Sequence, residues 1–442
     1  MSLKLATNGS SKSVLSEDFA MNPEMQYGGA LATNYTYVNA VPLSGYTPGS
    51  KITIDLPQEC ISMKDAYLQF QMTGSAGNTA GLLCSIVPDI RSLISRVVLQ
   101  IGSKVILDIS EFGLLNNIFD YTRDPQWANA QGRVMLATGV SQGGRNIKFG
   151  NPNLVYAARL NISDEADSIF SKILPLMKVG STMQLQIYLQ QDPSRVISTT
   201  TAVTGTIPPS FALNNVQFHY YTIVPSDSWN SMINERIMAG ALTFSARGFD
   251  YTQDTSLFLA GTQNASKTLN FKYSSLLGFI CAFQPQSYIT SYTNDTKMQY
   301  FYNPGLTTFR CRVGGNQYPM DNSTSDADMY GRFSLFFGLD DDTPTSAANS
   351  PYGVGSDTWS YVSGALPTAA SFIPCVNLCK YPNEIATDGR VVVDGLDTSI
   401  ATNVQLDIQL GTVVPQNMVT HIWAYYNYTI TINPNGSVSL NF

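Results

Sequence analysis

The sequence contains only two histidines, His219 and His421, in 442 residues. Hydrolase-type catalysis needs a base beside the nucleophile, and these two side chains are the only imidazole bases in the chain. Both lie within alternating apolar and polar patterns typical of strands, which favours structural, hydrogen-bonded histidines. A two-domain cupin enzyme would need a histidine cluster in each half. The shortage of histidine therefore argues against an enzyme, and we predict no catalytic residue and no cofactor.

Charged residues are also few, at 13% of the chain, with a net charge of -7 and a pI near 4.9. Direct sequence-specific binding of nucleic acid is not predicted, because that affinity depends on clustered Lys and Arg. No apolar run approaches the roughly 20 residues of a membrane-spanning helix. The longest run, around residues 276–283, has the length of a strand. The N-terminal residues lack the apolar segment of a secretory signal, so we expect synthesis and folding in a reducing compartment, without secretion.

Cysteine is sparse too, with six residues in the chain. They are Cys60, Cys84, Cys281, Cys311, Cys375 and Cys379. Most lie in apolar, strand-like runs, where a thiol acts as a small hydrophobic group, so buried free thiols are predicted. Cys375 and Cys379 are the only close pair, and a zinc site would need two further ligands from a chain with two histidines. No metal site is predicted.

Aromatic residues, by contrast, are abundant. The chain has 24 Tyr and 21 Phe, which favour the pleated surfaces of strands over helices. Its length exceeds the ~100 to 200 residues of one ordinary sandwich and is sufficient for two complete hydrophobic cores. The composition therefore predicts an all-β protein with two domains.

The stretch at residues 93–121 predicts two strands, a tight turn and a short helix. Apolar residues alternate on both sides of Gly102 and Ser103, which is the period of half-buried strands. Ser110 is then a candidate N-cap, and apolar residues return at helical spacing from Phe112 to Phe119. The pattern indicates a hairpin followed by a helix.

A similar hairpin is predicted 212 residues later, at residues 307–319. The turn residues assigned to the two hairpins are Gly102, Ser103, Gly314, Gly315 and Pro319. Residues 184–189 also match residues 405–410 in their alternation, at an offset of 221. A repeat near half the chain length indicates one structural unit used twice.

The repeat suggests three segments along the chain. Residues 1–48 lack sustained periodicity and are predicted to form an extended N-terminal arm, followed by a first domain at 49–225 and a second at 226–442. A helix is expected at the boundary, with Ser226 or Asp227 as its N-cap. In the second half, an apolar run at residues 329–339 is expected to continue the series of strands.

The sequence resembles the double jelly-roll major capsid proteins of tailless icosahedral double-stranded DNA viruses. Polinton-like viruses, virophages and nucleocytoplasmic large DNA viruses have such proteins. The resemblance covers nearly the whole chain, and its most telling parts are residues 94–121, 309–320 and 395–399. It implies two tandem eight-stranded jelly-roll sandwiches with a few short helices. It also implies a homotrimer that forms a pseudo-hexameric capsomer in the shell of the virion.

The expected function is therefore a capsid protein without catalysis. Its expected partners are itself, neighbouring capsomers and minor capsid or penton proteins, with an internal membrane underneath in some viruses. The alternative is a receptor- or carbohydrate-binding β-sandwich spike, with Trp127, Trp229 and Trp359 as stacking platforms. A third hypothesis, the single jelly-roll coat of an RNA virus, often includes a basic arm, and here the arm has only Lys4 and Lys12 as cations.

Overall fold

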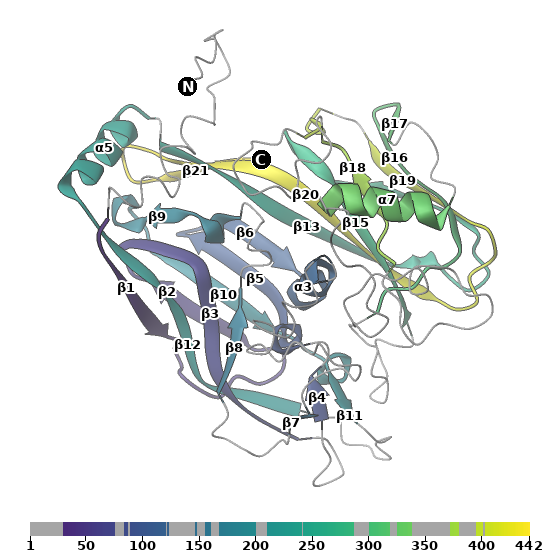
Figure 1. The fold of residues 1–442 in the computed structure, drawn as a ribbon, viewed down its shortest axis with the longest axis horizontal. Helices are drawn as coiled ribbons and strands as arrows, with labels where there is room; N and C mark the ends of the chain where they lie inside the picture. The colour runs from purple at the N-terminus through teal and green to yellow at the C-terminus, as the bar shows by residue number, and fades with distance from the viewer. Residues whose placement is uncertain are drawn as a thin grey trace.

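Two antiparallel β-sandwiches lie side by side in the computed structural model of the chain (Figure 1). The structure describes residues 30–75, 84–86, 89–120, 122, 146–147, 155–160, 168–199, 210–240, 242–286, 300–318, 325–337, 372–379, 395–400 and 403–442. Strands dominate this part of the chain, and its helices are short. The predicted all-β class is therefore confirmed.

The first sandwich contains eight main strands and one short addition. They are β1 (Ala30–Asn39), β2 (Lys51–Leu56), β3 (Cys60–Ser75), β5 (Ile94–Ile101), β6 (Lys104–Ser110), β8 (Val155–Arg159), β9 (Ile173–Pro175), β10 (Met183–Leu189) and β12 (Ser210–Pro225). One sheet has the order β1-β12-β3-β8 with β9 beside β3, and the other has the order β2-β10-β5-β6. Counted along the sandwich, strands 1-8-3-6 face strands 2-7-4-5, which is the jelly-roll connection.

The second sandwich repeats this connection. Its strands are β13 (Leu242–Phe258), β14 (Asn264–Leu269), β15 (Leu276–Pro285), β16 (Leu306–Val313), β17 (Asn316–Tyr318), β18 (Cys375–Asn377), β19 (Val404–Leu410), β20 (Met418–Ile432) and the added β21 (Val438–Asn441). The sheets have the orders β13-β20-β15-β18 and β14-β19-β16-β17, with β21 beside β20. The expected pair of tandem eight-stranded jelly rolls is thus confirmed, and we call them roll 1 and roll 2.

Short helices and one small sheet occupy the connections. The described helices are α3 (Phe112–Asp120), α5 (Asp227–Met238) and α7 (Asp326–Phe337), with 3-10 turns η1 (Ile90–Leu93), η3 (Ile169–Ser171), η4 (Leu176–Lys178) and η5 (Pro193–Arg195). The small sheet contains β4 (Cys84–Ile86), β7 (Asn146–Ile147) and β11 (Ile197–Thr199) in the order β11-β4-β7. Among the described residues, no helix is both long enough and apolar enough to cross a bilayer.

Alternating apolar residues account for the β2-β10-β5-β6 sheet of roll 1. In β2, Ile52, Ile54 and Leu56 are almost completely buried, while the residues between them are at least partly exposed. Ile187 of β10 lies opposite Ile52 on one side and Val97 of β5 on the other. A shift of one residue would turn these side chains away from the core, so burial fixes the register.

Helix α5 connects the two rolls. Ser226 is its N-cap, and the Ser226 hydroxyl accepts a hydrogen bond from the backbone N–H of Trp229 at 3.3 Å. No described strand before α5 pairs with a described strand after it. The assigned limits 1–48, 49–225 and 226–442 stay predictions.

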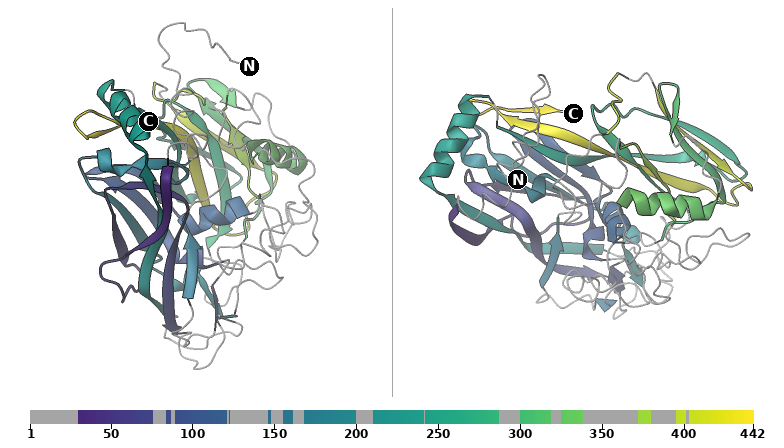
Figure 2. Two further views of the ribbon diagram at one scale, coloured as in Figure 1. Left: turned by 60° about the vertical axis from the view of Figure 1, so that its left-hand side comes forward. Right: turned by 45° about the horizontal axis from the view of Figure 1, so that its top comes forward.

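One apolar core extends through both rolls. The long strands β13 and β20 run from α5 towards the far end of roll 2 (Figures 1 and 2). Near α5, Phe244 and Ile430 of these strands share a small apolar cavity with Ile101, Ile106 and Leu174 of roll 1. All five side chains are buried and belong to the same hydrophobic cluster. The shared core holds the rolls in one fixed arrangement, because separation would expose these side chains to water.

Ten residues of the predicted N-terminal arm form a strand. Residues 30–39 form β1, the first strand of roll 1, paired along β12. The sequence did not predict this strand because Tyr35 and Tyr37, its largest side chains, point outward and are 47% and 53% exposed. An edge strand with aromatic residues on its outer face lacks the usual alternation of apolar and polar positions. Residues 1–29 of the predicted arm lie outside the described residues.

The apolar run at residues 329–339 was wrongly expected to be a strand. Its described part belongs to helix α7, which ends at Phe337. Met329, Phe333 and Phe336 recur at helical spacing and are buried on one face. Short apolar runs do not distinguish buried strands from buried helices by hydrophobicity alone. With this correction, each roll has a hairpin followed by a helix.

Candidate assembly surfaces

The predicted hairpin turns lie at corresponding places in the two rolls. Gly102 and Ser103 join β5 to β6, and Gly314 and Gly315 join β16 to β17. Gly102 (φ 58°) and Gly314 (φ 64°) adopt the left-handed region that glycine tolerates best. Pro319 lies outside the described residues. The described turn residues lie in the two hairpins, and the structural role assigned to them stays a prediction.

A helix follows each hairpin, and the two helices share a motif that the sequence analysis did not identify. In α3 an aromatic residue precedes Gly113, and in α7 an aromatic residue precedes Gly331, 218 residues later. The same offset relates Phe119 to Phe337. The rings of Phe119 and Phe337 lie edge to face with centroids 5.3 Å apart. Corresponding residues of the two rolls therefore meet, and an alignment of the two helices would have revealed the repeat.

Strands β6 of roll 1 and β13 of roll 2 lie beside each other at the junction (Figure 1). The indole N–H of Trp423 in β20 donates to the carbonyl oxygen of Ser110 at 3.4 Å. The ammonium group of Lys104 donates to the carbonyl oxygen of Val438 in β21 at 2.5 Å. Polar contacts therefore fix the alignment of the rolls along the shared apolar core.

A buried polar cluster lies at the same junction. Arg195 of roll 1 donates to both carboxylate oxygens of Glu111, at 3.0 and 3.2 Å. In roll 2, the Tyr251 hydroxyl and His421 Nδ1 share a hydrogen bond of 2.8 Å. Burial, assisted by the charge of Arg195, lowers the pKa of His421 to about 3, and burial raises the pKa of Tyr251. Both groups are neutral at pH 7, which suits a structural role better than proton transfer.

A buried ion cluster fastens helix α3. Arg91 is 1% exposed, and its guanidinium donates to Asp89, to Asp120 at the end of α3, and to the side-chain oxygen of Asn116. Burial alone would lower the pKa of Arg91, but the charges of Asp120 and Asp89 outweigh it and raise the pKa. Such a cluster is stable only when every charge is paired, so it fixes the position of α3.

The outer surface of roll 1 carries an aromatic patch around β1. Tyr35 and Tyr37 approach the His219 ring with centroid distances of 5.7 and 5.3 Å, and Tyr67 stacks on it at 4.7 Å. Tyr221 completes the set, 5.0 Å from Tyr35. We call these five residues the β1 face. Burial lowers the pKa of His219, so the ring is neutral at pH 7. The β1 face is therefore an uncharged, partly exposed aromatic surface.

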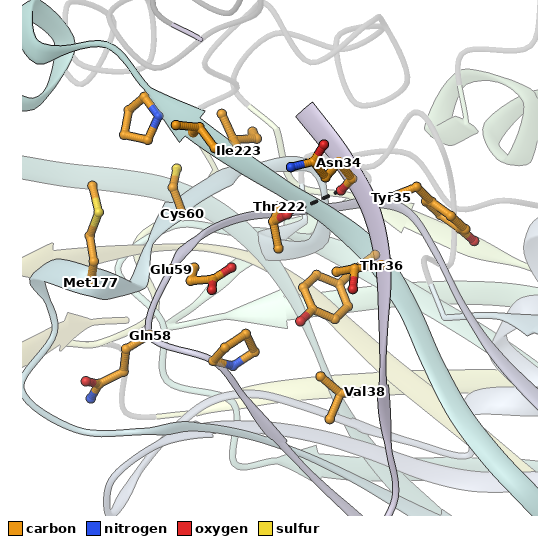
Figure 3. Close-up of a pocket in the computed structure, with 14 residues that line it drawn as sticks. Asn34, Tyr35, Thr36, Val38, Gln58, Glu59, Cys60, Met177, Thr222 and Ile223 are labelled. Carbon is orange, nitrogen blue, oxygen red and sulfur yellow. Dashed lines mark hydrogen bonds between the residues drawn. The ribbon is translucent and has the colours of Figure 1, made fainter. Parts of the chain in front are cut away.

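A groove of about 700 Å³ opens on the other side of β1 (Figure 3). Asn34 and Thr36 of β1 line one wall, and the turn that carries Glu59 and Cys60 lines the opposite wall. The Thr222 hydroxyl donates to the Asn34 carbonyl oxygen at 3.4 Å. Burial raises the pKa of the Cys60 thiol to about 12, so it stays protonated and is a poor nucleophile. The groove does not combine a nucleophile with a base.

A second cavity, of about 370 Å³, lies between the rolls. Its carboxylates already have partners: Asp108 accepts from Arg96 at 2.7 Å, and Asp250 accepts from the Tyr273 hydroxyl at 2.6 Å. No histidine lines this cavity. Among the described residues, no group of three or more His, Cys, Asp or Glu side chains is placed to hold a metal ion. The described cavities thus offer no constellation for catalysis.

The structure weakens the two alternative hypotheses. Trp229 is buried in α5 at 8% exposure, so it is not a stacking platform for a sugar. Trp127 and Trp359 lie outside the described residues. The presence of two rolls contradicts the single jelly-roll hypothesis.

No protein-family model matches the sequence, and no curated protein matches it. Its fold is similar to solved viral structures. A chain of the Sputnik virophage gives a TM-score of 0.58 at 11% identity, over 94% of this chain and 89% of that one. The faustovirus major capsid protein gives a TM-score of 0.53 at 10% identity, over 91% of this chain and 90% of that one. The mavirus major capsid protein gives a TM-score of 0.51 at 10% identity, over 92% of this chain and 90% of that one. The chain therefore has the double jelly-roll fold of these major capsid proteins.

Proposed function

We propose that this protein is a major capsid protein that self-assembles as homotrimeric, pseudo-hexameric capsomers tiling an icosahedral virion shell. The observation that carries the proposal is the presence of two jelly rolls with the same strand order in one chain. The likeness to the faustovirus and mavirus major capsid proteins, over about nine-tenths of each chain, supports it. The protein acts through its shape and its contacts, without catalysis or a cofactor.

The proposed mechanism is geometric. Three chains bring six similar rolls around one axis, which gives a six-sided building block from a threefold assembly. The shared core between the rolls keeps each chain from flexing at α5, so the angle between rolls is set before assembly. Contacts between chains in such a permanent assembly belong to the class of roughly 2,000 Å² or more.

The proposal includes further partners. Neighbouring capsomers meet at the edges of the six-sided block, and minor capsid or penton proteins fill the vertices. An internal membrane lies underneath where the virus has one. The protein is made and assembled inside the host cell and ends in the capsid shell. The net charge of -7 supports a shell that makes no direct sequence-specific contact with the genome.

The mass of the purified full chain in solution tests the proposal. Analytical ultracentrifugation should give three times the 48.2 kDa mass of the chain, and electron micrographs should show six-sided particles. The measurement should cover a series of salt concentrations and chain concentrations, because large interfaces can need screening of charge. A chain that stays monomeric throughout the series would contradict the proposal.

A further inference from the structure

Each roll begins with an edge strand, but the described residues of the other roll cover only one of these two strands. In roll 2, β13 lies beside β6 of roll 1, and its Phe249 is 4% exposed. The Phe249 ring packs edge to face on Phe119 of α3, with centroids 5.6 Å apart. In roll 1, β1 takes the same place in the sheet order, yet Tyr35 and Tyr37 are about half exposed. The structure itself thus shows what covers such a strand when a neighbouring roll is present.

The two edge strands carry similar side chains at corresponding places. Tyr37 of β1 lies opposite His219, and Phe249 of β13 lies opposite Tyr425. The ring centroids are 5.3 Å apart in the first pair and 4.6 Å apart in the second. Each roll therefore has an aromatic cross-strand pair between its first and eighth strands. The pair in roll 2 is buried, whereas in roll 1 His219 is buried and Tyr37 is 53% exposed.

The sequence around β1 gives no sign of protection against association. Residues 25–50 contain no Asp, Glu, Lys or Arg. Natural proteins usually protect a long exposed edge strand with charges, prolines or bulges, because its unpaired backbone groups recruit other chains. The ten residues of β1 contain no proline and no charge, with one irregularity near Ala30. Such an edge is typical of a surface that becomes buried.

The surface that covers β13 also has a counterpart. Roll 1 covers roll 2 with β6 and α3, and the same places in roll 2 are taken by β17 and α7. The α3 residue that packs on β13 is Phe119, and its counterpart at the 218-residue offset, Phe337, is 6% exposed and packs on Phe119 itself. Two residues earlier in α7, Leu335 is 49% exposed. An exposed leucine at this place is available for a contact with another chain.

We propose that the β1 face of one copy of this chain docks against the α7 side of roll 2, around Leu335, in a second copy. The contact between chains then repeats the contact that roll 1 and roll 2 make within the chain. It joins two different surfaces, so successive copies add head to tail and close into a ring. This inference rests on the proposed capsid function and names the surfaces that form its trimer.

Lysine substitutions on the two surfaces test the proposal. Tyr35→Lys with Tyr37→Lys places charge in the β1 face, and Leu335→Lys places charge on α7. Val155→Lys is the matched control, because Val155 is 54% exposed on β8, the other edge of the same sheet. We expect the chain concentration at half-trimerisation to rise about tenfold or more for the first two variants and to be unchanged for the control. Circular dichroism checks that each variant is folded, and Leu335→Lys alone decides the result if the tyrosine variant unfolds.

A mixture of the two variants gives a sharper test. Each variant keeps one intact surface, so one copy of each can join through the remaining intact pair. A head-to-tail contact predicts a one-to-one dimer that does not close into a trimer, and a mixture that stays monomeric would overturn the proposal. If the wild type and each of the two variants form trimers, this inference is overturned and the proposed capsid function is unaffected. A wild-type chain that never trimerises would instead remove the proposed function and this inference together.

Discussion

Replacement of Arg91 by methionine should destabilise roll 1 strongly. Arg91, Asp89 and Asp120 are each 1% exposed, so Arg91→Met would leave two carboxylates in the core without a cation. The side-chain oxygen of Asn116 would also lose a donor that lies 3.2 Å away. Removal of one partner from a buried ion pair costs about 3–5 kcal/mol. The free energy of unfolding, measured by urea titration with circular dichroism, should fall by that amount.

A neutral replacement of the whole cluster provides the control for Arg91→Met. The triple variant Asp89→Asn, Arg91→Met, Asp120→Asn has no buried charge, so it should regain most of the lost free energy of unfolding. The double variant Asp89→Asn, Asp120→Asn should be destabilised, because it leaves the arginine without carboxylates. A cost below about 1 kcal/mol for Arg91→Met, or a triple variant less stable than Arg91→Met, would refute the reasoning.

Three further predictions concern a turn, a histidine and the thiols. Gly102→Val should destabilise the fold and reduce trimer yield more than Gly314→Val. Both valines would be strained at positive φ, but only the first would have its Cβ against the Ser181 hydroxyl, at 3.2 Å. An equal fall in melting temperature for the two variants would contradict this prediction. The pKa of His421 is about 3 in the fold, below its unfolded value near 6.5, so the stability that the neutral ring contributes is lost as pH falls from about 6.5 to 3. His421→Gln should reduce the pH dependence of the free energy of unfolding over this range by up to about 1.4 kcal/mol per pH unit, measured by urea titrations. An unchanged pH dependence in the variant would contradict this prediction. Four of the six cysteines are buried as free thiols, including Cys60 and Cys281, and burial raises the pKa of both thiols. These four should react with Ellman's reagent only after unfolding, and fast labelling of more than two thiols per native chain would count against the predicted thiol burial.

Much of the fold could be predicted wherever one face of a strand is apolar. The alternating residues 184–189 lie within strand β10 (Met183–Leu189), because the odd-numbered residues of this strand point into the core. The turn at Gly102 and Ser103 was also correctly placed between two strands. In these places the burial of alternate side chains decides the structure, and that signal is present in the sequence.

Other features depended on contacts that a local pattern does not contain. Ser110 was predicted to cap helix α3, but the helix begins at Phe112 after Glu111, which has a φ of 51°. Ser110 is instead the last residue of β6, and its carbonyl oxygen binds Trp423 of the other roll, 313 residues away. Sequence patterns give no register between such distant segments, so the junction could not be predicted.

The buried charged groups were missed for the same reason. Arg91 reaches Asp120 across 29 residues, and Arg195 reaches Glu111 across 84 residues. Each residue alone has the composition of a solvated surface position, since buried charges are rare without partners. Only the folded arrangement reveals that these charges neutralise each other.

The contact between β6 and β13 changes how an assembly depends on concentration, because it is made within one chain. The linker through α5 keeps the two rolls together before any other chain arrives, so this contact needs no collision. In the proposed ring of alternating rolls, three bodies have to meet instead of six. By mass action, the ring population then varies with the third power of the free chain concentration, whereas separate rolls would give the sixth. Tandem fusion thus allows rings to persist in a dilute solution where single rolls would separate.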